Sequence, residues 1–274
     1  GDLYYYGNGV EQFYSKAKEY YEESSKLGNS NALNNLGILY ENGYGVEQNY
    51  SQAKEYYEES SKLGNSEALN NLGDLYYYGY GVEQNYSQAK KYYEKSSKLG
   101  NSEALNNLGY LYENGHGVEQ DYSKAKEYYE QSSKRGNSEA LNNLGNLYKN
   151  GHGVEQDYSK AKEYYEKSSK FWNSKALNNL GNLYKNGHRV EQDYSKAKEY
   201  YEQSSKRGNS EALNNLGYLY YNGYGVEQDY SQAKEYYEQS SKLGNVVSMY
   251  HLGELYEEGR GVEQNYSKAI EYYE

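Results

Sequence analysis

The chain has 274 residues, no Cys, no Pro, 43 Tyr and a formal net charge of −11. The absence of Cys excludes disulfides, thiolate metal sites and thiol catalysis, and the acidic balance opposes a nucleic-acid backbone or an anionic membrane surface as a partner. No apolar run approaches the roughly 20 residues that a membrane-spanning helix needs, and the lack of Pro fits an uninterrupted series of helices.

One cassette of 36 residues repeats along the whole chain. An Ala recurs at this spacing from Ala32 to Ala212, with Ser248 in the last copy, and a Gly recurs from Gly1 to Gly253. A fixed period of this length indicates a stacked array of small units, each of which borrows its core from its neighbours. We therefore expect one array over 1–274, divided in chain order into a truncated repeat 1–30, repeats 31–66, 67–102, 103–138, 139–174, 175–210 and 211–246, and a truncated last repeat 247–274.

The first half of each repeat is predicted to be a helix, as the repeat from Ser102 to Asn137 illustrates. Leu105, Leu108 and Leu111 follow the spacing of one apolar helical stripe. Gly109 lies inside this helix, where Gly costs roughly 1 kcal/mol relative to Ala. Its recurrence in every repeat predicts that a neighbouring helix passes very close at that point.

The second half of the repeat is predicted to be another helix. Gly115 and Gly117 break the first helix, and Asp121 is a suitable N-cap for the second, while Gly136 suits a left-handed C-cap. The buried stripe of this helix should contain Tyr122, Ala125, Tyr128, Tyr129, Ser132 and Ser133. The predicted fold is all-α, a right-handed superhelical α-solenoid of about seven and a half 36-residue helix-turn-helix repeats with a concave inner face.

The residues at these positions resemble those of the Sel1-like repeat, a relative of the tetratricopeptide repeat. The resemblance covers essentially the whole chain and is carried by the pattern Ala104-x-x-x-Leu108-Gly109-x-x-Tyr112-x-x-Gly115-x-Gly117-Val118-x-x-Asp121-x-x-x-Ala125-x-x-Tyr128-Tyr129, followed by Gly136. The family usually has two Ala where this chain has Ser132 and Ser133, and Arg189 replaces the second loop Gly of one repeat. The resemblance implies adaptor and scaffold work, without naming one partner.

The positions at which the repeats differ lie three residues apart, on one face of the first helix. By analogy with tetratricopeptide arrays, this face would line the concave groove. A recurrent Asn shares it, and in related repeats Asn at that place hydrogen-bonds an extended peptide or its terminal carboxylate. Alternatively, these Asn cap or solvate a helix face copied by duplication. The candidate peptide-binding residues here are Asn107, Tyr110, Asn143, Asn146, Asn179, Asn182, Asn215 and Tyr218.

Charge is uneven along the array. Residues 175–210 hold seven Lys or Arg against four Asp or Glu, whereas residues 31–66 hold two against five. We expect Lys149, Lys175 and Lys185 to complete the candidate site. They would receive an acidic segment or a C-terminal carboxylate of a protein or peptide partner through charge-assisted hydrogen bonds. Random drift on a solvated surface would explain the same charges.

No catalytic, cofactor-binding or metal-binding site is predicted. The Ser residues recur at core or cap positions and the carboxylates on solvent faces, so no nucleophile and base stand out. His116, His152 and His188 share one loop position, but repeats stacked roughly 10 Å apart keep three nitrogens from converging on a zinc at about 2.0–2.1 Å. Phe171-Trp172 replaces the pair that ends the second helix elsewhere. We expect it to repack into the next repeat, and the alternative is an exposed aromatic pair that anchors an interface.

The sequence thus predicts a non-catalytic interaction scaffold or adaptor that binds a peptide or partner protein on the concave face. The alternative is a structural repeat element of a larger filament or assembly. The near-identity of the repeats favours this alternative, as do the truncated ends, which would then self-associate. No nucleic acid, no membrane insertion and no cofactor are expected, and the composition favours a soluble, cytoplasmic protein.

Overall fold

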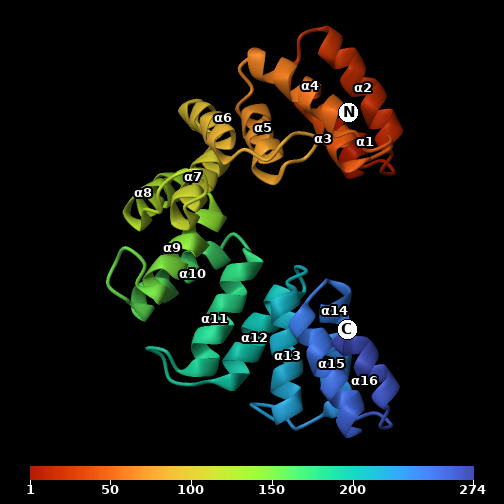
Figure 1. Cartoon of the computed structure of the whole chain (residues 1–274), viewed down its shortest axis with the longest axis vertical. Coiled ribbons are helices and arrows are strands. Elements are labelled where there is room, and N and C mark those ends of the chain that lie inside the picture. The colour runs from red at the N-terminus through yellow and green to blue at the C-terminus, as the bar shows by residue number, and fades with distance from the viewer. The chain divides into compact units, whose positions relative to one another are not determined.

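The computed structural model describes all 274 residues, which form 16 α-helices and no strand. The chain divides into two compact units, Gly1–Asn137 (unit 1) and Ser138–Glu274 (unit 2). Unit 1 contains α1 (Asp2–Tyr6), α2 (Tyr14–Lys26), α3 (Ser30–Asn42), α4 (Tyr50–Lys62), α5 (Ser66–Tyr78), α6 (Tyr86–Lys98), α7 (Ser102–Asn114) and α8 (Tyr122–Lys134). Unit 2 contains α9 (Ser138–Asn150), α10 (Tyr158–Ser169), α11 (Ser174–Asn186), α12 (Tyr194–Ser205), α13 (Ser210–Asn222), α14 (Tyr230–Lys242), α15 (Val246–Glu258) and α16 (Tyr266–Tyr273) (Figure 1).

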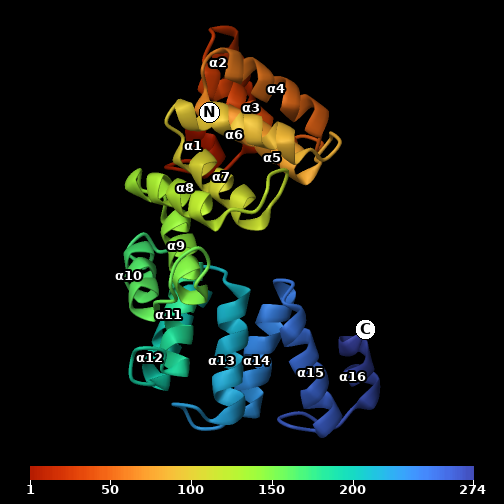
Figure 2. The ribbon, with the colours of Figure 1, turned by 60° about the vertical axis from the view of Figure 1, so that its left-hand side comes forward.

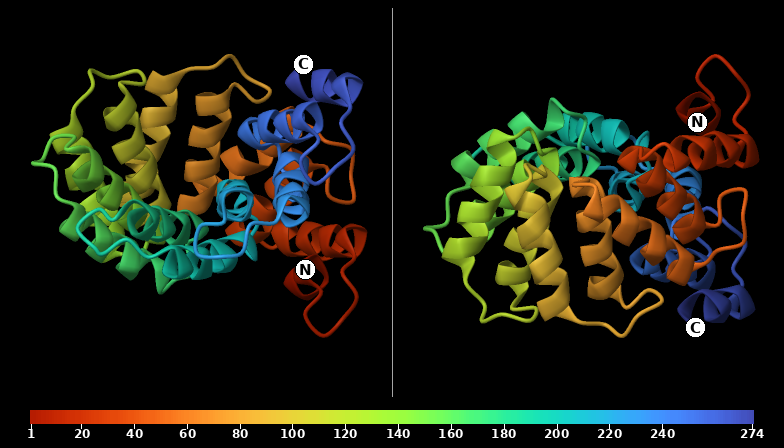
Figure 3. Two further views of the ribbon diagram at one scale, coloured as in Figure 1. Left: turned by 90° about the horizontal axis from the view of Figure 1, so that it is seen from below. Right: turned by 90° about the horizontal axis from the view of Figure 1, so that it is seen from above.

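Within each unit the helices form pairs. Each odd-numbered helix, called helix A below, contacts the even-numbered helix B that follows it, and helix B then contacts the next helix A. In unit 2 the helices α11, α12, α13 and α14 lie side by side in this order (Figure 2), and the loops join neighbouring helices at their ends (Figure 3). The prediction of an all-α fold built from helix-turn-helix repeats is confirmed. No helix is long and apolar enough to cross a bilayer.

Side-chain caps set the starts of both helices. Asn101 is the N-cap of α7, because its Oδ1 accepts a hydrogen bond from the Ala104 N–H at 2.9 Å. Asp121 caps α8 in the same way, accepting from the Lys124 N–H at 3.0 Å. Short polar residues at the two starts therefore account for the regular length of the repeat.

The recurrent Gly of helix A is a contact surface for an aromatic ring. A Cβ atom added to Gly109 would lie 2.6 Å from Cε1 of Tyr129, which is fully buried on helix B of the same repeat. The predicted close approach of a neighbouring helix is thus confirmed. The same contact joins Gly37 to Tyr57, Gly73 to Tyr93, Gly145 to Tyr165, Gly181 to Tyr201 and Gly217 to Tyr237.

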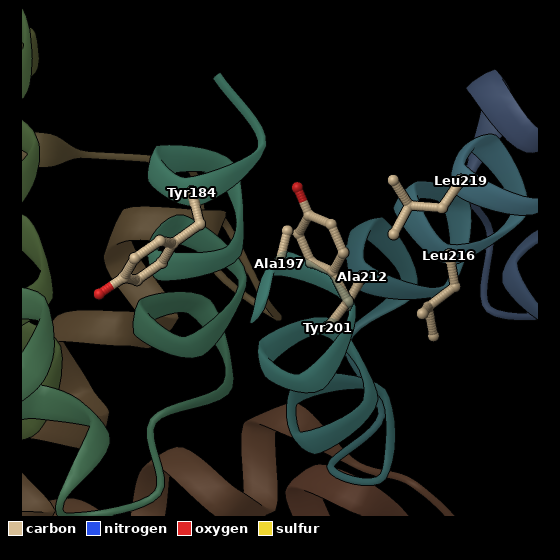
Figure 4. Close-up of a cluster of buried hydrophobic side chains, with 6 residues drawn as sticks. All are labelled: Tyr184, Ala197, Tyr201, Ala212, Leu216 and Leu219. Carbon is tan, nitrogen blue, oxygen red and sulfur yellow. The ribbon is translucent and has the colours of Figure 1, made fainter. Parts of the chain in front are cut away.

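The buried clusters bridge consecutive helices. The cluster drawn in Figure 4 takes Tyr184 from α11, Ala197 and Tyr201 from α12, and three residues from α13. A buried Ser adds a polar link between helices, because Ser204 Oγ on α12 donates to the Ser174 carbonyl oxygen at 2.7 Å. Since each cluster needs the helix A of the following repeat, the repeats share their cores, as expected for a stacked array.

Aromatic stacking also joins one repeat to the next. The residue before the second loop Gly stacks on the first Tyr of the previous helix B. Ring centroids lie 4.7 Å apart for His116 and Tyr86, and 4.5 Å apart for His188 and Tyr158. Arg260 takes the same place 5.6 Å from Tyr230. Tyr, His and Arg interchange at this loop position because each presents a flat π system to the underlying ring.

Phe171-Trp172 contacts the next repeat through Trp172, but the pair is not buried there. Both side chains stay exposed, by 59% and 57%. Trp172 adopts φ 59°, the left-handed conformation that Gly supplies at this point of most other repeats. Its ring instead lies against the Arg207 guanidinium, 4.4 Å from the ring centroid. The turn is thus kept, and the aromatic pair remains on the surface.

The contact between the helix A glycine and the tyrosine ring can be tested by adding one methyl group to the glycine. We expect Gly109→Ala to lower the free energy of unfolding by about 1–3 kcal/mol, because the added carbon would overlap the Tyr129 ring. Urea denaturation followed by circular dichroism measures the change. Gly64→Ala is the matched control. Its methyl group meets open space, so only backbone strain at φ 83° is added, roughly 1–2 kcal/mol.

A double-mutant cycle separates overlap from strain. Tyr129→Leu should recover part of the stability lost in Gly109→Ala and none of that lost in Gly64→Ala. Equal recovery in both backgrounds would contradict the steric explanation.

Candidate functional site

Two consecutive Asn on most helices A link neighbouring helices A to each other. In unit 1, Asn107 Nδ2 on α7 donates to Asn70 Oδ1 on α5 at 3.1 Å. In unit 2, Asn179 Nδ2 donates to Asn142 Oδ1 at 2.9 Å. Asn215 and Asn178 make the same bond at 3.0 Å, and Asn71 and Asn34 make it in unit 1. The Asn predicted to bind peptide therefore first form a ladder between neighbouring helices.

This Asn ladder uses the amide donors and leaves a carbonyl oxygen. Asn179 Nδ2 also lies 3.3 Å from Asn146 Oδ1, and Asn215 Nδ2 lies 3.4 Å from Asn182 Oδ1. With its N–H groups engaged in this way, Asn179 keeps Oδ1 as an acceptor. Asn143 occupies the corresponding place on α9, where it is half-buried. A ligand would therefore meet an acceptor rather than a donor at Asn179, whereas Asn215 Oδ1 already lies 3.4 Å from Lys185 Nζ.

The varying positions of helix A supply acceptors to the buried Tyr of helix B. The Tyr93 hydroxyl donates to Asp74 Oδ1 at 2.6 Å, whereas the Tyr129 hydroxyl donates to Glu113 Oε2 at 2.5 Å. Asp74 occupies the first varying position of its helix, and Glu113 the second, one turn further on. A hydroxyl at the edge of a packed core needs such a partner.

We call the two varying positions of one helix A the acceptor pair. In unit 2, Asn146 and Asn182 accept from Tyr165 and Tyr201, each at 2.7 Å. The acceptor is a short Asp or Asn when it occupies the first position, and a longer Glu when it occupies the second position. In chain order the pairs are Asp2/Tyr5, Ile38/Glu41, Asp74/Tyr77, Tyr110/Glu113, Asn146/Lys149, Asn182/Lys185, Tyr218/Tyr221 and Glu254/Glu257.

Two of the three predicted lysines are half-buried without a carboxylate partner. Burial lowers the pKa of Lys149 and of Lys185, because the ammonium loses hydration. Lys185 Nζ lies 3.4 Å from Asn215 Oδ1 and 5.3 Å from the ring centroid of Tyr218, which is 36% exposed. Lys149 Nζ forms no ion pair or hydrogen bond, and the charge of Glu211 only weakly opposes its lowered pKa.

The third predicted lysine is placed differently. Lys175 is exposed, and its Nζ forms an ion pair with Glu139 Oε1 at 2.5 Å. Its charge is therefore already compensated. Tyr110, the remaining predicted residue, lies in unit 1 on α7, where it is 43% exposed and contacts Tyr77 edge-on, with ring centroids 6.2 Å apart.

A cavity of about 510 Å³ in unit 2 brings several predicted residues together. It lies at the end of α9 and along α11. Its predicted members are Lys149, Asn179 and Asn182. Sequence reasoning missed the loop and helix B residues that complete it. The full lining is Lys149, Asn150, His152, Gln156, Tyr158, Asn179, Asn182, Leu183, Asn186 and His188.

A cavity of about 490 Å³ in unit 1 has the opposite character. Glu67 and Glu103 line it, together with Asn34 and Asn71. Burial raises the pKa of Glu103, and the charge of Glu67 raises it further. Since its titratable lining is acidic, this cavity disfavours anions. The cationic cavity in unit 2 is therefore the better candidate for an acidic ligand.

Comparison with known proteins agrees with the geometry. A family model described as Sel1 repeat matches residues 1–29, 30–65, 66–101, 102–137, 138–170, 174–209, 210–245 and 246–274. A protective antigen of uropathogenic Escherichia coli strains with an SLR fold is 32% identical with a TM-score of 0.67. The match covers 99% of this chain and only 58% of the antigen chain.

Two further solved structures share the fold. A Sel1 repeat protein from Oxalobacter formigenes is 27% identical over 89% of this chain and 97% of its own, with a TM-score of 0.78. An immunity protein from Pseudomonas aeruginosa is 22% identical over 78% of this chain and 81% of its own, with a TM-score of 0.59. Among curated proteins, the comparison finds no match.

The acceptor pair containing Asp74 predicts a pH-dependent stability. Burial raises the pKa of Asp74 to about 7 from 3.8, although the hydrogen bond from Tyr93 opposes the change. The folded state therefore holds a proton that the unfolded state has lost, so stability falls as pH rises from about 4 to about 7. We expect Asp74→Asn to remove this loss, because Asn146 accepts the equivalent hydrogen bond without a charge.

Thermal unfolding measured from pH 4 to pH 8 tests this expectation. The midpoint of Asp74→Asn should equal that of the parent at low pH and exceed it by roughly 2–4 °C at pH 8. Asp229→Asn, which removes the N-cap carboxylate of α14, is the control for the loss of one charge. A constant difference between Asp74→Asn and the parent across the range would contradict the role of the carboxyl group.

Proposed function

We propose that this chain, which belongs to the Sel1 repeat family, is a non-catalytic scaffold that binds an acidic, extended segment of a partner protein on the helix A face of unit 2. The observation that carries the proposal is the pair of half-buried lysines, Lys149 and Lys185, neither of which has a carboxylate partner. A buried ammonium without a counter-charge is unfavourable. A carboxylate of the partner would supply the missing counter-charge.

The Asn ladder also supports an extended peptide as the ligand on this face. Lys149 and Asn179 line one cavity, and Asn179 offers a carbonyl oxygen as an acceptor. An extended peptide presents backbone N–H groups as well as side chains, so it can donate to Asn while its carboxylates meet Lys. Asn143, Asn146, Asn182, Asn215 and Tyr218 extend this surface within unit 2, and Asn107 and Tyr110 occupy the corresponding face of unit 1.

Lys175 plays a different part in this proposal. Its ammonium is exposed and paired with Glu139, so a ligand carboxylate would have to displace an existing partner. An exposed ion pair is typically worth only about 0–1 kcal/mol. We therefore assign Lys175 to the rim of the site, and Lys149 and Lys185 to its centre.

Reversal of the two central lysines tests the proposal. A labelled peptide of alternating Gly and Glu with blocked ends is titrated with the full chain, and fluorescence anisotropy measures its affinity. We expect Lys149→Glu/Lys185→Glu to weaken binding roughly tenfold or more, because hydrogen bonds to charged groups are lost. Lys170→Glu/Lys206→Glu changes the net charge equally at the ends of α10 and α12, and should leave the affinity within about twofold.

Three outcomes would count against the scaffold. Equal weakening by both double variants would show that only net charge matters. Equal affinity for the acidic peptide and for a peptide with Gln in place of Glu would remove the carboxylate from the proposal. Self-association of the chain without peptide binding, seen by sedimentation, would favour a structural repeat element instead.

A further inference from the structure

We call the helix B tyrosine that packs on the helix A glycine the central tyrosine of its repeat. Tyr237 is the one central tyrosine whose hydroxyl does not donate to its acceptor pair. Tyr237 on α14 is 1% exposed, and no hydrogen bond engages its hydroxyl. Its acceptor pair is Tyr218/Tyr221, which contains no carboxylate and no amide. The other seven hydroxyls donate to Asp2, Glu41, Asp74, Glu113, Asn146, Asn182 and Glu257. One repeat of unit 2 therefore lacks an internal acceptor that every other repeat has.

The Tyr237 hydroxyl is held in place and remains reachable. Its ring packs on the backbone of Gly217, where an added Cβ would lie 2.5 Å from Cε1. The His251 ring lies 4.9 Å from the Tyr237 ring. Every fully buried side-chain nitrogen or oxygen has a hydrogen-bond partner, so the unpaired hydroxyl oxygen must keep some solvent contact. A ligand atom can therefore reach a donor that is otherwise fixed by the core.

Neighbouring carboxylates are engaged elsewhere. His251 takes the place of the recurrent Asn, and its Nδ1 lies 2.9 Å from Glu254 Oε2. Glu258 Oε2 lies 2.9 Å from Arg260 Nε and 3.3 Å from the Tyr221 hydroxyl. The two acidic side chains of this part of α15 thus have partners of their own, and neither accepts from Tyr237.

Cations flank both members of the Tyr218/Tyr221 pair. Lys185 Nζ lies 5.3 Å from the Tyr218 ring centroid, and the Arg260 guanidinium lies 5.4 Å from the Tyr221 ring centroid and donates to its hydroxyl. Burial raises the pKa of Tyr237, so its hydroxyl keeps its proton and remains a donor. The surroundings therefore combine one unpaired neutral donor with the unpaired ammonium of Lys185, whereas Glu258 compensates the charge of Arg260 and the charge of Glu254 also acts on Tyr237.

We propose that a carboxylate of the ligand completes this repeat by accepting the hydrogen bond of Tyr237, with the unpaired ammonium of Lys185 balancing its charge. The chain itself shows the chemistry, because a carboxylate is the acceptor in five of the seven paired repeats: Asp2, Glu41, Asp74, Glu113 and Glu257. The inference rests on the proposed function and adds a recognition site for one carboxylate to it. The carboxylate belongs either to an Asp or Glu side chain or to a chain terminus.

Three peptides distinguish these sources of the carboxylate. The first has blocked ends and alternating Gly and Glu, the second has Gln in place of Glu and a free C-terminal carboxylate, and the third has Gln and blocked ends. Fluorescence anisotropy with the full chain measures each affinity. We expect Tyr237→Phe to weaken binding of one or both carboxylate peptides roughly tenfold or more, and to leave the third unchanged. The peptide that responds identifies the source.

Tyr57→Phe is the matched control for the loss of one central hydroxyl. Tyr57 is equally buried, but its hydroxyl is already bonded to Glu41 in unit 1. The variant should therefore bind all three peptides as the parent does. Circular dichroism of both variants checks that the helices are intact.

A second variant supplies the missing acceptor within the chain. Tyr218→Asn places an Asn at the first position of this acceptor pair. Asn182 holds that position in the preceding repeat, where its amide oxygen accepts a hydrogen bond from the Tyr201 hydroxyl at 2.7 Å. We expect a higher thermal midpoint, because the Tyr237 hydroxyl gains a partner, and an affinity for the carboxylate peptides as low as that of Tyr237→Phe.

The outcomes separate this inference from the proposed function. If Tyr237→Phe binds the carboxylate peptides as the parent does, while Lys149→Glu/Lys185→Glu does not, the role of Tyr237 is overturned and the scaffold stands. If the parent chain itself does not discriminate the carboxylate peptides from the third peptide, both fail. An unchanged or lower thermal midpoint for Tyr218→Asn would also overturn the inference.

Discussion

A tyrosine ring lying on the backbone of a helix A glycine organises each repeat. The glycine lets the ring approach to a distance that any Cβ would block, and the ring fixes helix B against helix A. The hydroxyl at the far end of the ring then meets the varying face of helix A, where it needs an acceptor. Core packing and the chemistry of the candidate site are therefore linked through a single side chain.

This link explains why the second position of some acceptor pairs can be a lysine. In the repeats with Asn146 and Asn182, a short amide at the first position satisfies the tyrosine hydroxyl. The second position is then released from that task, and it holds Lys149 and Lys185. Where the first position is Ile38 or Tyr110, a Glu at the second position is the acceptor instead.

Much of the fold could be predicted because its determinants act over short separations in sequence. The cap at Asp121 and the glycine at position 109 each leave a local signature, and the period of 36 residues repeats it. The roles of the site residues could not be predicted in the same way. The partner of a tyrosine hydroxyl lies 16 or 19 residues away, and the pairing of Lys175 with Glu139 spans 36 residues. Such partners become visible only once the direction of each side chain is known.

The acceptor of each paired tyrosine lies within the same repeat, while the Asn ladder joins equivalent positions of adjacent repeats. A copy inserted or deleted as a whole cassette therefore brings or removes both the hydroxyl and its acceptor, and the new junction finds the same Asn on either side. The array is thus suited to changing its length by unequal recombination of its own coding repeats. Substitution of an acceptor, by contrast, alters the chemistry of one repeat without disturbing the register of the others.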